Sequence, residues 1–231
     1  FNGARLLGPA IAGLMIAAWG IWPVVAINTL SFVAVLLGLY LMNPDELRPA
    51  PVRRGKGAIR EGLAYVRARP DLQLILFCMF MLGTFGLNFQ ITNALMATRE
   101  FGVGPEGYGL LGSVMAAGTL AAALLAARRR QPRMRLLVGA LAAFAVSMTL
   151  LAMSPSYWVY AVLLVPVGLT SLTVMTAANT TVQLTTEPAM RGRVMSLYMA
   201  IFTGGTPLGA PLIGWVGDAW GPRWTLLVGA I

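Results

Sequence analysis

Amide and hydroxyl side chains that interrupt long apolar stretches are the residues best suited to bind a solute. The segment from 158 to 184 contains Thr173, Thr176, Asn179, Thr180 and Gln183, at successive intervals of three, three, one and three. A helix turns by about 100° per residue, so these side chains would project within an arc of roughly 120°. Such groups are costly against hydrocarbon, and they should face either a wet pathway or a packed neighbouring helix.

Two further segments carry similar polar residues. In the segment from 72 to 97, Thr84, Asn88 and Thr92 form one helical stripe, while Gln90 and Asn93 fall on a different face. In the segment from 194 to 217, Ser196, Thr203 and Thr206 share a face. We therefore expect a substrate pathway that includes Asn88, Thr92, Thr176, Asn179, Gln183, Thr203 and Thr206. The alternative is that these groups only form hydrogen bonds between packed helices.

The residue types that are missing exclude most enzymatic chemistry. The chain has no histidine, and its one cysteine, Cys78, has no partner for a disulfide within the chain. A histidine-based zinc site, a Ser-His-Asp triad and a near-neutral imidazole relay are therefore excluded. No Asp or Glu lies inside a complete apolar segment. We expect a protein that is not an enzyme and holds no metal or cofactor.

Composition identifies the elements that must position these polar groups. Of 231 residues, 58% are hydrophobic and 11% are charged, whereas soluble domains have about 45 to 50% apolar and about 25% charged residues. The charge-free stretches are long enough for spans of about 20 residues. The fold class is therefore all-α, a polytopic membrane protein. Its expected helices cover residues 1 to 19, 22 to 42, 72 to 97, 108 to 127, 136 to 153, 158 to 184 and 194 to 217, with a partial helix from 224.

Basic residues are distributed unequally between the two sides of these spans. Of the 17 Lys and Arg residues, 14 fall in the connections 43–71, 128–135 and 187–193, and only Arg99 and Arg223 fall on the opposite side. The first group should be cytoplasmic by the positive-inside rule. The net charge of +9 is explained in this way without a nucleic-acid partner.

The sequence of the longest connection predicts a short helix. Ile59, Leu63 and Val66 fall at helical spacing opposite Arg60 and Arg67, which predicts an amphipathic helix at the cytoplasmic interface. A solvated basic linker is the alternative.

A repeat indicates two related halves. Residues 7–23 (LGPAIAGLMIAAWGIWP) align without gaps on 208–224 (LGAPLIGWVGDAWGPRW) with six identities in 17 positions. We expect parallel halves related by an axis along the membrane normal. The chain would then hold the end of the first half at 1–42, an inter-half linker at 43–71 and the second half at 72–231, with the first and last helices incomplete.

Three segments together resemble the major facilitator superfamily, and within it the drug and siderophore exporters of the enterobactin-exporter and macrolide-efflux type. They are NGARLLGPAIAG at 2–13, EGLAYV at 61–66 ahead of Pro70, and EPAMRGRVMS at 187–196. The resemblance covers the whole chain. It implies helices five to twelve of a twelve-helix transporter that works by alternating access.

The resemblance also suggests packing and gating roles. Gly8, Pro9 and Gly13 look like the antiporter motif of the fifth helix, where small residues allow close helix approach and proline bends the helix. The eleventh helix repeats this character, and the loop before it carries two arginines suited to contacts with the other half. These residues are Gly205, Pro207, Gly209, Gly214, Arg191 and Arg193. The alternatives are that the glycines and prolines only allow tight helix packing, and that the two arginines only hold their loop on the cytoplasmic side.

Arg5 is predicted to place a positive charge deep in the membrane. The repeat places it 14 residues below Trp19, which is about 21 Å along a helix and close to the bilayer centre. A guanidinium there costs at least about 2.5 kcal/mol, so it should point into the bundle. We expect Arg5 to line the pathway, with a fixed interhelical ion pair or snorkelling toward the cytoplasm as alternatives.

These observations predict a multi-pass transporter of the bacterial inner membrane that exports small amphipathic molecules, driven by a proton gradient. Drug, macrolide or siderophore-like molecules are the expected cargo, the lipid bilayer is the expected environment, and a monomer is the expected state. The alternatives are uptake of a small nutrient, a membrane-embedded lipid-modifying enzyme, and a scaffold or receptor that keeps the fold.

Overall fold

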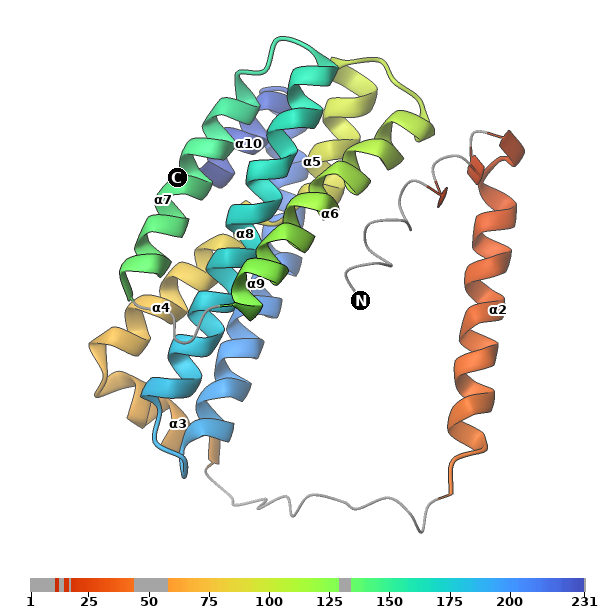
Figure 1. Ribbon diagram of the computed structural model, residues 1–231. Coiled ribbons are helices and arrows are strands. Elements are labelled where there is room, and N and C mark those ends of the chain that lie inside the picture. Colours follow the sequence, from red (N-terminus) through yellow and green to blue (C-terminus); the bar gives the residue numbers. More distant parts are fainter. Residues whose placement is uncertain (1–10, 13–14, 17, 44–57, 129–133, 231) are drawn as a thin grey trace.

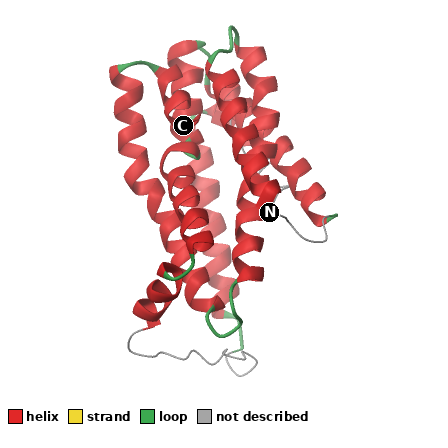
Figure 2. Cartoon of the chain, turned by 90° about the vertical axis from the view of Figure 1, so that its left-hand side faces the viewer, coloured by secondary structure: helices red, strands yellow, loops and turns green. Residues whose placement is uncertain are grey.

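The computed structural model describes residues 11–12, 15–16, 18–43, 58–128 and 134–230. It contains only helices and loops within these ranges (Figures 1 and 2). The helices, in chain order, are α2 (Ile21–Tyr40), α3 (Ala58–Arg67), α4 (Pro70–Met81), η2 (Leu82–Gly86), α5 (Phe89–Leu95), η3 (Met96–Glu100), α6 (Pro105–Ala127), α7 (Met134–Ala152), α8 (Tyr157–Thr185), α9 (Arg191–Ala219) and α10 (Pro222–Ala230).

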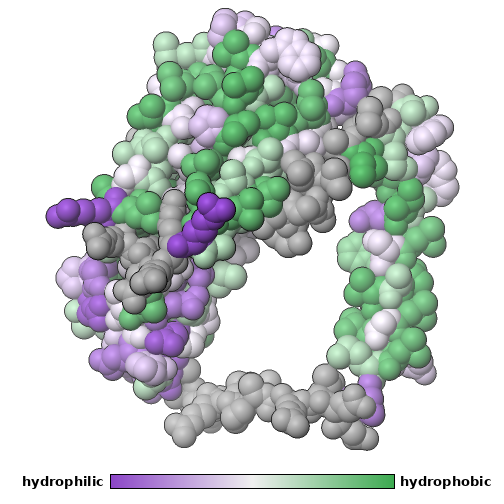
Figure 3. All heavy atoms as spheres, viewed as in Figure 1, coloured by the Kyte–Doolittle hydropathy of each residue, from purple (hydrophilic) through white to green (hydrophobic). Residues whose placement is uncertain are grey.

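Six helical segments of the described chain are long and apolar enough to cross a membrane. They are Ile21–Tyr40, Pro70–Glu100, Pro105–Ala127, Met134–Ala152, Tyr157–Thr185 and Arg191–Ala219. Figure 3 shows apolar surface over much of the bundle and hydrophilic residues gathered at the end that carries α3. The predicted all-α membrane architecture is confirmed, with helix ends within a few residues of those expected.

The predicted continuous helix from 72 to 97 is wrong in one respect. The Pro70–Glu100 span begins as α4, widens into the π-helix η2, leaves helical geometry at Leu87 and Asn88, and resumes as α5 and η3. Each π turn inserts a residue into the helical repeat, so the faces before and after it no longer align. This break determines which polar side chains of the span lie together.

Glycines set the closest helix approaches in the bundle. Gly118 of α6 lies against the carbonyl oxygen of Val165 in α8, and Gly168 of α8 lies against the carbonyl oxygen of Met115 in α6. An added Cβ at either position would overlap the opposite backbone. The two helices therefore fit together through reciprocal small residues, as is common in membranes.

The amphipathic helix predicted in the linker is present as α3, and part of its apolar face packs on protein. Val66 of α3 is buried in the core, whereas Ile59 is exposed. Gly62 approaches α9 so closely that an added Cβ would lie 3.3 Å from the Cβ of Arg193. Within the described residues, α2 stands apart from this bundle, and none of its residues is buried (Figure 1).

Candidate functional site

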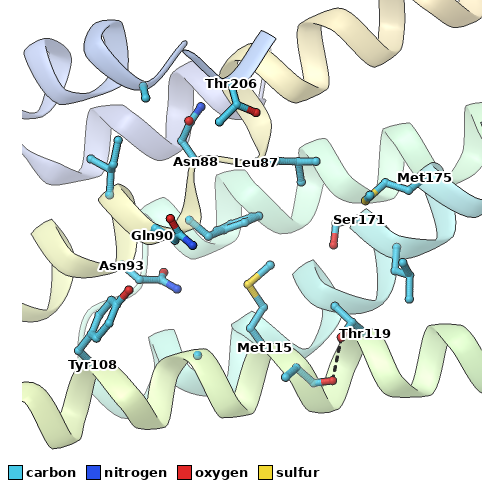
Figure 4. A pocket seen from close by; sticks show the side chains of 16 residues that line it. Leu87, Asn88, Gln90, Asn93, Tyr108, Met115, Thr119, Ser171, Met175 and Thr206 are labelled. Carbon is cyan, nitrogen blue, oxygen red and sulfur yellow. Dashed lines mark hydrogen bonds between the residues drawn. The ribbon is translucent and has the colours of Figure 1, made fainter. Parts of the chain in front are cut away.

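A cavity of about 530 Å³ opens between the interrupted span and helices α6, α8 and α9 (Figure 4). Its wall combines apolar and thioether side chains with uncharged polar groups. The lining residues are Leu87, Asn88, Phe89, Gln90, Ile91, Asn93, Tyr108, Gly112, Met115, Ala116, Thr119, Ser171, Leu172, Met175, Thr206 and Ala210. Such a mixture suits an amphipathic small molecule.

The structure brings some of the expected pathway residues to this cavity. Asn88 and Thr206 line it. Thr92 is only 4% exposed and is not among the lining residues. Thr203 is exposed on α9 and also lies outside the lining.

The predicted arc of α8 runs along the helix beyond the cavity. Two of its hydroxyls donate to their own helix: Thr173 Oγ1 to the Leu169 carbonyl, and Thr176 Oγ1 to the Leu172 carbonyl. Gln183 Nε2 donates to Asn179 Oδ1 at 2.5 Å. Asn179 is half-buried and Gln183 is exposed. Thr176, Asn179 and Gln183 therefore form a polar surface near the cavity without lining it.

The interrupted span regroups its own polar residues. Sequence spacing separates Asn88 from Gln90 and Asn93, yet all three line the cavity. The reason is the non-helical backbone at Leu87 and Asn88, which invalidates a constant turn of about 100° per residue across it. Without knowledge of the break in the helix, the sequence offers no reason to group these three residues.

Other lining residues went unnoticed in the sequence although a signal for them exists. In α6, Tyr108, Gly112, Met115, Ala116 and Thr119 all line the cavity. They follow one another at spacings of four, three, one and three, which is the spacing of a single helical face. Ser171 on α8 also lines the cavity, next to Leu172 and Met175.

The glycines of α9 pack within this bundle. Gly209 lies directly against the Thr84 carbonyl oxygen, and a Cβ at Gly205 would lie 2.7 Å from Thr84 Oγ1. Gly214 has open space around it among the described residues. Pro207 lies inside α9, between the two packed glycines. The expected motif residues Gly8, Pro9 and Gly13, together with Arg5, lie outside the part of the chain whose side chains are described.

At the α3 end, polar contacts hold the linker helix on the bundle. Arg193 pairs with Glu61 of α3 at 3.2 Å, and Arg191 is exposed. Arg69 forms two hydrogen bonds with the Asp71 carboxylate, at 2.9 and 2.7 Å, and a longer one of 3.4 Å with the Thr185 carbonyl. The hydrogen bonds to Asp71 raise the pKa of Arg69 above its ordinary value, because they favour the charged guanidinium.

Comparison with known proteins identifies the family. The family described as transmembrane secretion effector matches residues 1–231. The uncharacterized MFS-type transporter YfiS of Bacillus subtilis (strain 168) is 32% identical over 137 residues, which cover 56% of this chain and 32% of that protein. The aligned region is thus about a third of that relative, and no solved structure matches the chain. Since the family match covers every residue, the chain belongs to the transmembrane secretion effector family of major facilitator superfamily transporters, and so to transporters rather than enzymes.

Proposed function

We propose that this chain is part of an exporter that moves small amphipathic molecules across the bacterial inner membrane by alternating access. The observation that carries the proposal is the cavity, because amides and hydroxyls stand among methionine and aromatic side chains in its wall. Apolar surface holds the body of an amphipathic cargo, and the polar groups replace part of its hydration. Drug, macrolide and siderophore-like molecules all have this mixed character.

The helices around the cavity are packed so closely that we expect them to move together. The close contacts of α6 with α8, and of α9 with η2, involve glycine against backbone and leave little room for sliding. The cavity wall would therefore move with these helices while its opening alternates between the two sides of the membrane. The interrupted span supplies non-helical backbone at the cavity, where such backbone is tolerated in a membrane.

Proton-coupled antiport is the proposed source of energy. Coupling requires a group that gains and loses a proton inside the pathway. In the described spans, the acidic residues lie only near helix ends, at Asp71, Glu100, Glu106 and Asp218. The proton carrier is therefore proposed to lie elsewhere in the full-length transporter, with Arg5 close to it in the pathway.

The charge distribution supports an orientation with α3 in the cytoplasm. At the opposite end, both arginines are paired with carboxylates: Arg99 with Asp218 at 2.6 Å and Arg223 with Glu100 at 2.9 Å. At the α3 end, Arg128 and other arginines have no carboxylate within 4.0 Å among the described residues. The uncompensated positive charge thus lies on the proposed cytoplasmic side.

Transport by the full-length protein in proteoliposomes tests this proposal. An imposed pH gradient should drive an amphipathic fluorescent dye across the membrane, and collapsing the gradient with a protonophore should stop it. Protein-free liposomes are the control for passive leakage. Dye movement that ignores the gradient would refute proton coupling, and no movement of any dye tested would refute the exporter proposal.

A further inference from the structure

The cavity wall carries hydrogen-bonding groups whose direction is set by their own partners. Sixteen residues line the cavity and none of them is charged. Figure 4 shows the carboxamides of Asn88, Gln90 and Asn93 on one side, with Thr119 and Ser171 on the opposite side. The existing partner of each group determines whether it can still donate or accept a hydrogen bond in the cavity.

Asn88 presents an oxygen. Its Nδ2 donates to the Thr84 carbonyl at 2.6 Å, and its side chain is only 6% exposed. Because a carbonyl can only accept, this bond determines which end of the carboxamide is nitrogen. Asn88 lines the cavity, so Oδ1 is the atom of its carboxamide that is left to accept a hydrogen bond there.

Asn93 presents the opposite polarity. Its Oδ1 accepts a hydrogen bond of 2.7 Å from the hydroxyl of Tyr160, a residue that is fully buried and lies outside the cavity lining. The Nδ2 atom of Asn93 is left as a donor, and Figure 4 shows it directed into the pocket. Tyr160 is thus a positioning residue for this amide.

The serine and threonine hydroxyl groups of the wall have used their protons on backbone oxygens. Thr119 donates to the Ala116 carbonyl at 2.9 Å, and Ser171 donates to the Gly168 carbonyl at 3.0 Å. Thr206 makes a longer bond of 3.4 Å to the Gly83 carbonyl. Each hydroxyl has a single proton, so each offers a cavity ligand only lone pairs unless it gives up its backbone bond.

We propose that this cavity selects a cargo group that donates hydrogen bonds, a hydroxyl or an amine on an apolar frame, and disfavours carboxylates. Asn88, Thr119, Ser171 and Thr206 present acceptors, Gln90 and Tyr108 can donate or accept, and Asn93 presents a donor. A carboxylate would meet more acceptors than donors, and the lining holds no cation to compensate its charge. This inference rests on the proposed function, because it assigns the chemistry of the cargo to the same cavity.

The test compares fluorescent probes that differ only at one end. Dansyl probes with the same alkyl chain end in a hydroxyl, a primary amine, a methyl ether or a carboxylate. Binding to the purified full-length protein in detergent is measured at equilibrium from dansyl fluorescence. The hydroxyl and amine probes should bind about threefold to tenfold more tightly than the ether, the effect of a single hydrogen bond, and the carboxylate should bind most weakly.

A matched pair of serine variants assigns the preference to this cavity. Ser171→Ala removes an acceptor from the wall, whereas Ser147→Ala removes a hydroxyl of α7 that is also buried and donates to the Ala143 carbonyl away from the cavity. The first change should reduce the hydroxyl-over-ether preference about threefold, and the second should leave it unchanged. Equal binding of hydroxyl and ether probes by the unmodified protein, tightest binding of the carboxylate, or the same effect of both variants would overturn the proposal.

The binding measurement also separates this inference from the exporter proposal. It uses no gradient, so a clear hydroxyl preference in a protein that fails to transport any dye would support the cavity chemistry and refute only export. Dye transport combined with equal binding of the hydroxyl and ether probes would refute the cavity chemistry and leave export standing.

Discussion

Gly209→Ala should destabilise the bundle because it places a methyl group into a backbone contact. A Cβ at this position overlaps the carbonyl oxygen of Thr84 in η2. That carbonyl cannot easily retreat, since it also accepts the hydrogen bond from Asn88 Nδ2, and Thr84 Oγ1 donates to the Phe80 carbonyl. The change therefore forces either α9 or the interrupted span to move.

The expected magnitude follows from two opposing effects. Overpacking a close contact costs about 1 to 3 kcal/mol, and a rigid backbone atom favours the upper part of that range. Replacing a glycine by alanine inside a helix returns up to about 1 kcal/mol through helix propensity. The net loss should be about 1 to 2 kcal/mol, which corresponds to roughly a 5- to 30-fold change in the unfolding equilibrium constant.

Equilibrium unfolding of the full-length protein in mixed micelles, followed by tryptophan fluorescence during a titration with sodium dodecyl sulfate, measures this difference. Gly139→Ala is the matched control, because Gly139 lies inside α7 and has nothing within 4 Å of its added Cβ. The control should be neutral or slightly stabilised. If Gly209→Ala proves as stable as Gly139→Ala, the close α9–η2 contact does not hold the bundle as described.

The remaining predictions concern orientation and pathway. A single cysteine at Gln131 should react with a membrane-impermeant thiol reagent only from the cytoplasm, and one at Gly104 only from outside, because basic residues concentrate at the first end. Asn179→Leu or Gln183→Leu should shift the transport rate or cargo preference severalfold in a transport assay while expression stays near normal, since the two amides form one exposed polar pair. Arg5→Ala should reduce transport at least about tenfold, because the sequence predicts a guanidinium at mid-membrane depth, where a charge needs a contact inside the bundle.

Each of these predictions has a result that contradicts it. Labelling of Gly104 from inside alone would reverse the orientation. Unchanged transport of every cargo by the Asn179 and Gln183 variants would favour simple packing. Near-normal transport by a well-expressed Arg5→Ala protein would refute a pathway role, and loss of folded protein from the membrane would instead indicate a structural ion pair.

The positions and the helical type of the described membrane spans followed from the sequence alone. Apolar stretches free of charge must form helices in a bilayer, because no water is present to satisfy backbone groups, so segments such as 158–184 could be delimited directly. The amphipathic pattern of the linker likewise predicted α3. The resemblance of three short segments pointed to the superfamily that the family match then established.

The residues that line the cavity, and the polarity of its wall, depend on the tertiary structure. Helical spacing assigned Asn88 and Asn93 to different faces, and only the non-helical backbone at Asn88 brings both to one wall. The polarity of that wall depends on Tyr160, which lies 67 residues away from Asn93 along the chain and orients its amide. A periodic pattern encodes local faces, because one helix turns at a constant angle. It does not encode where that angle changes or which distant hydroxyl meets which amide, because these depend on how the helices pack.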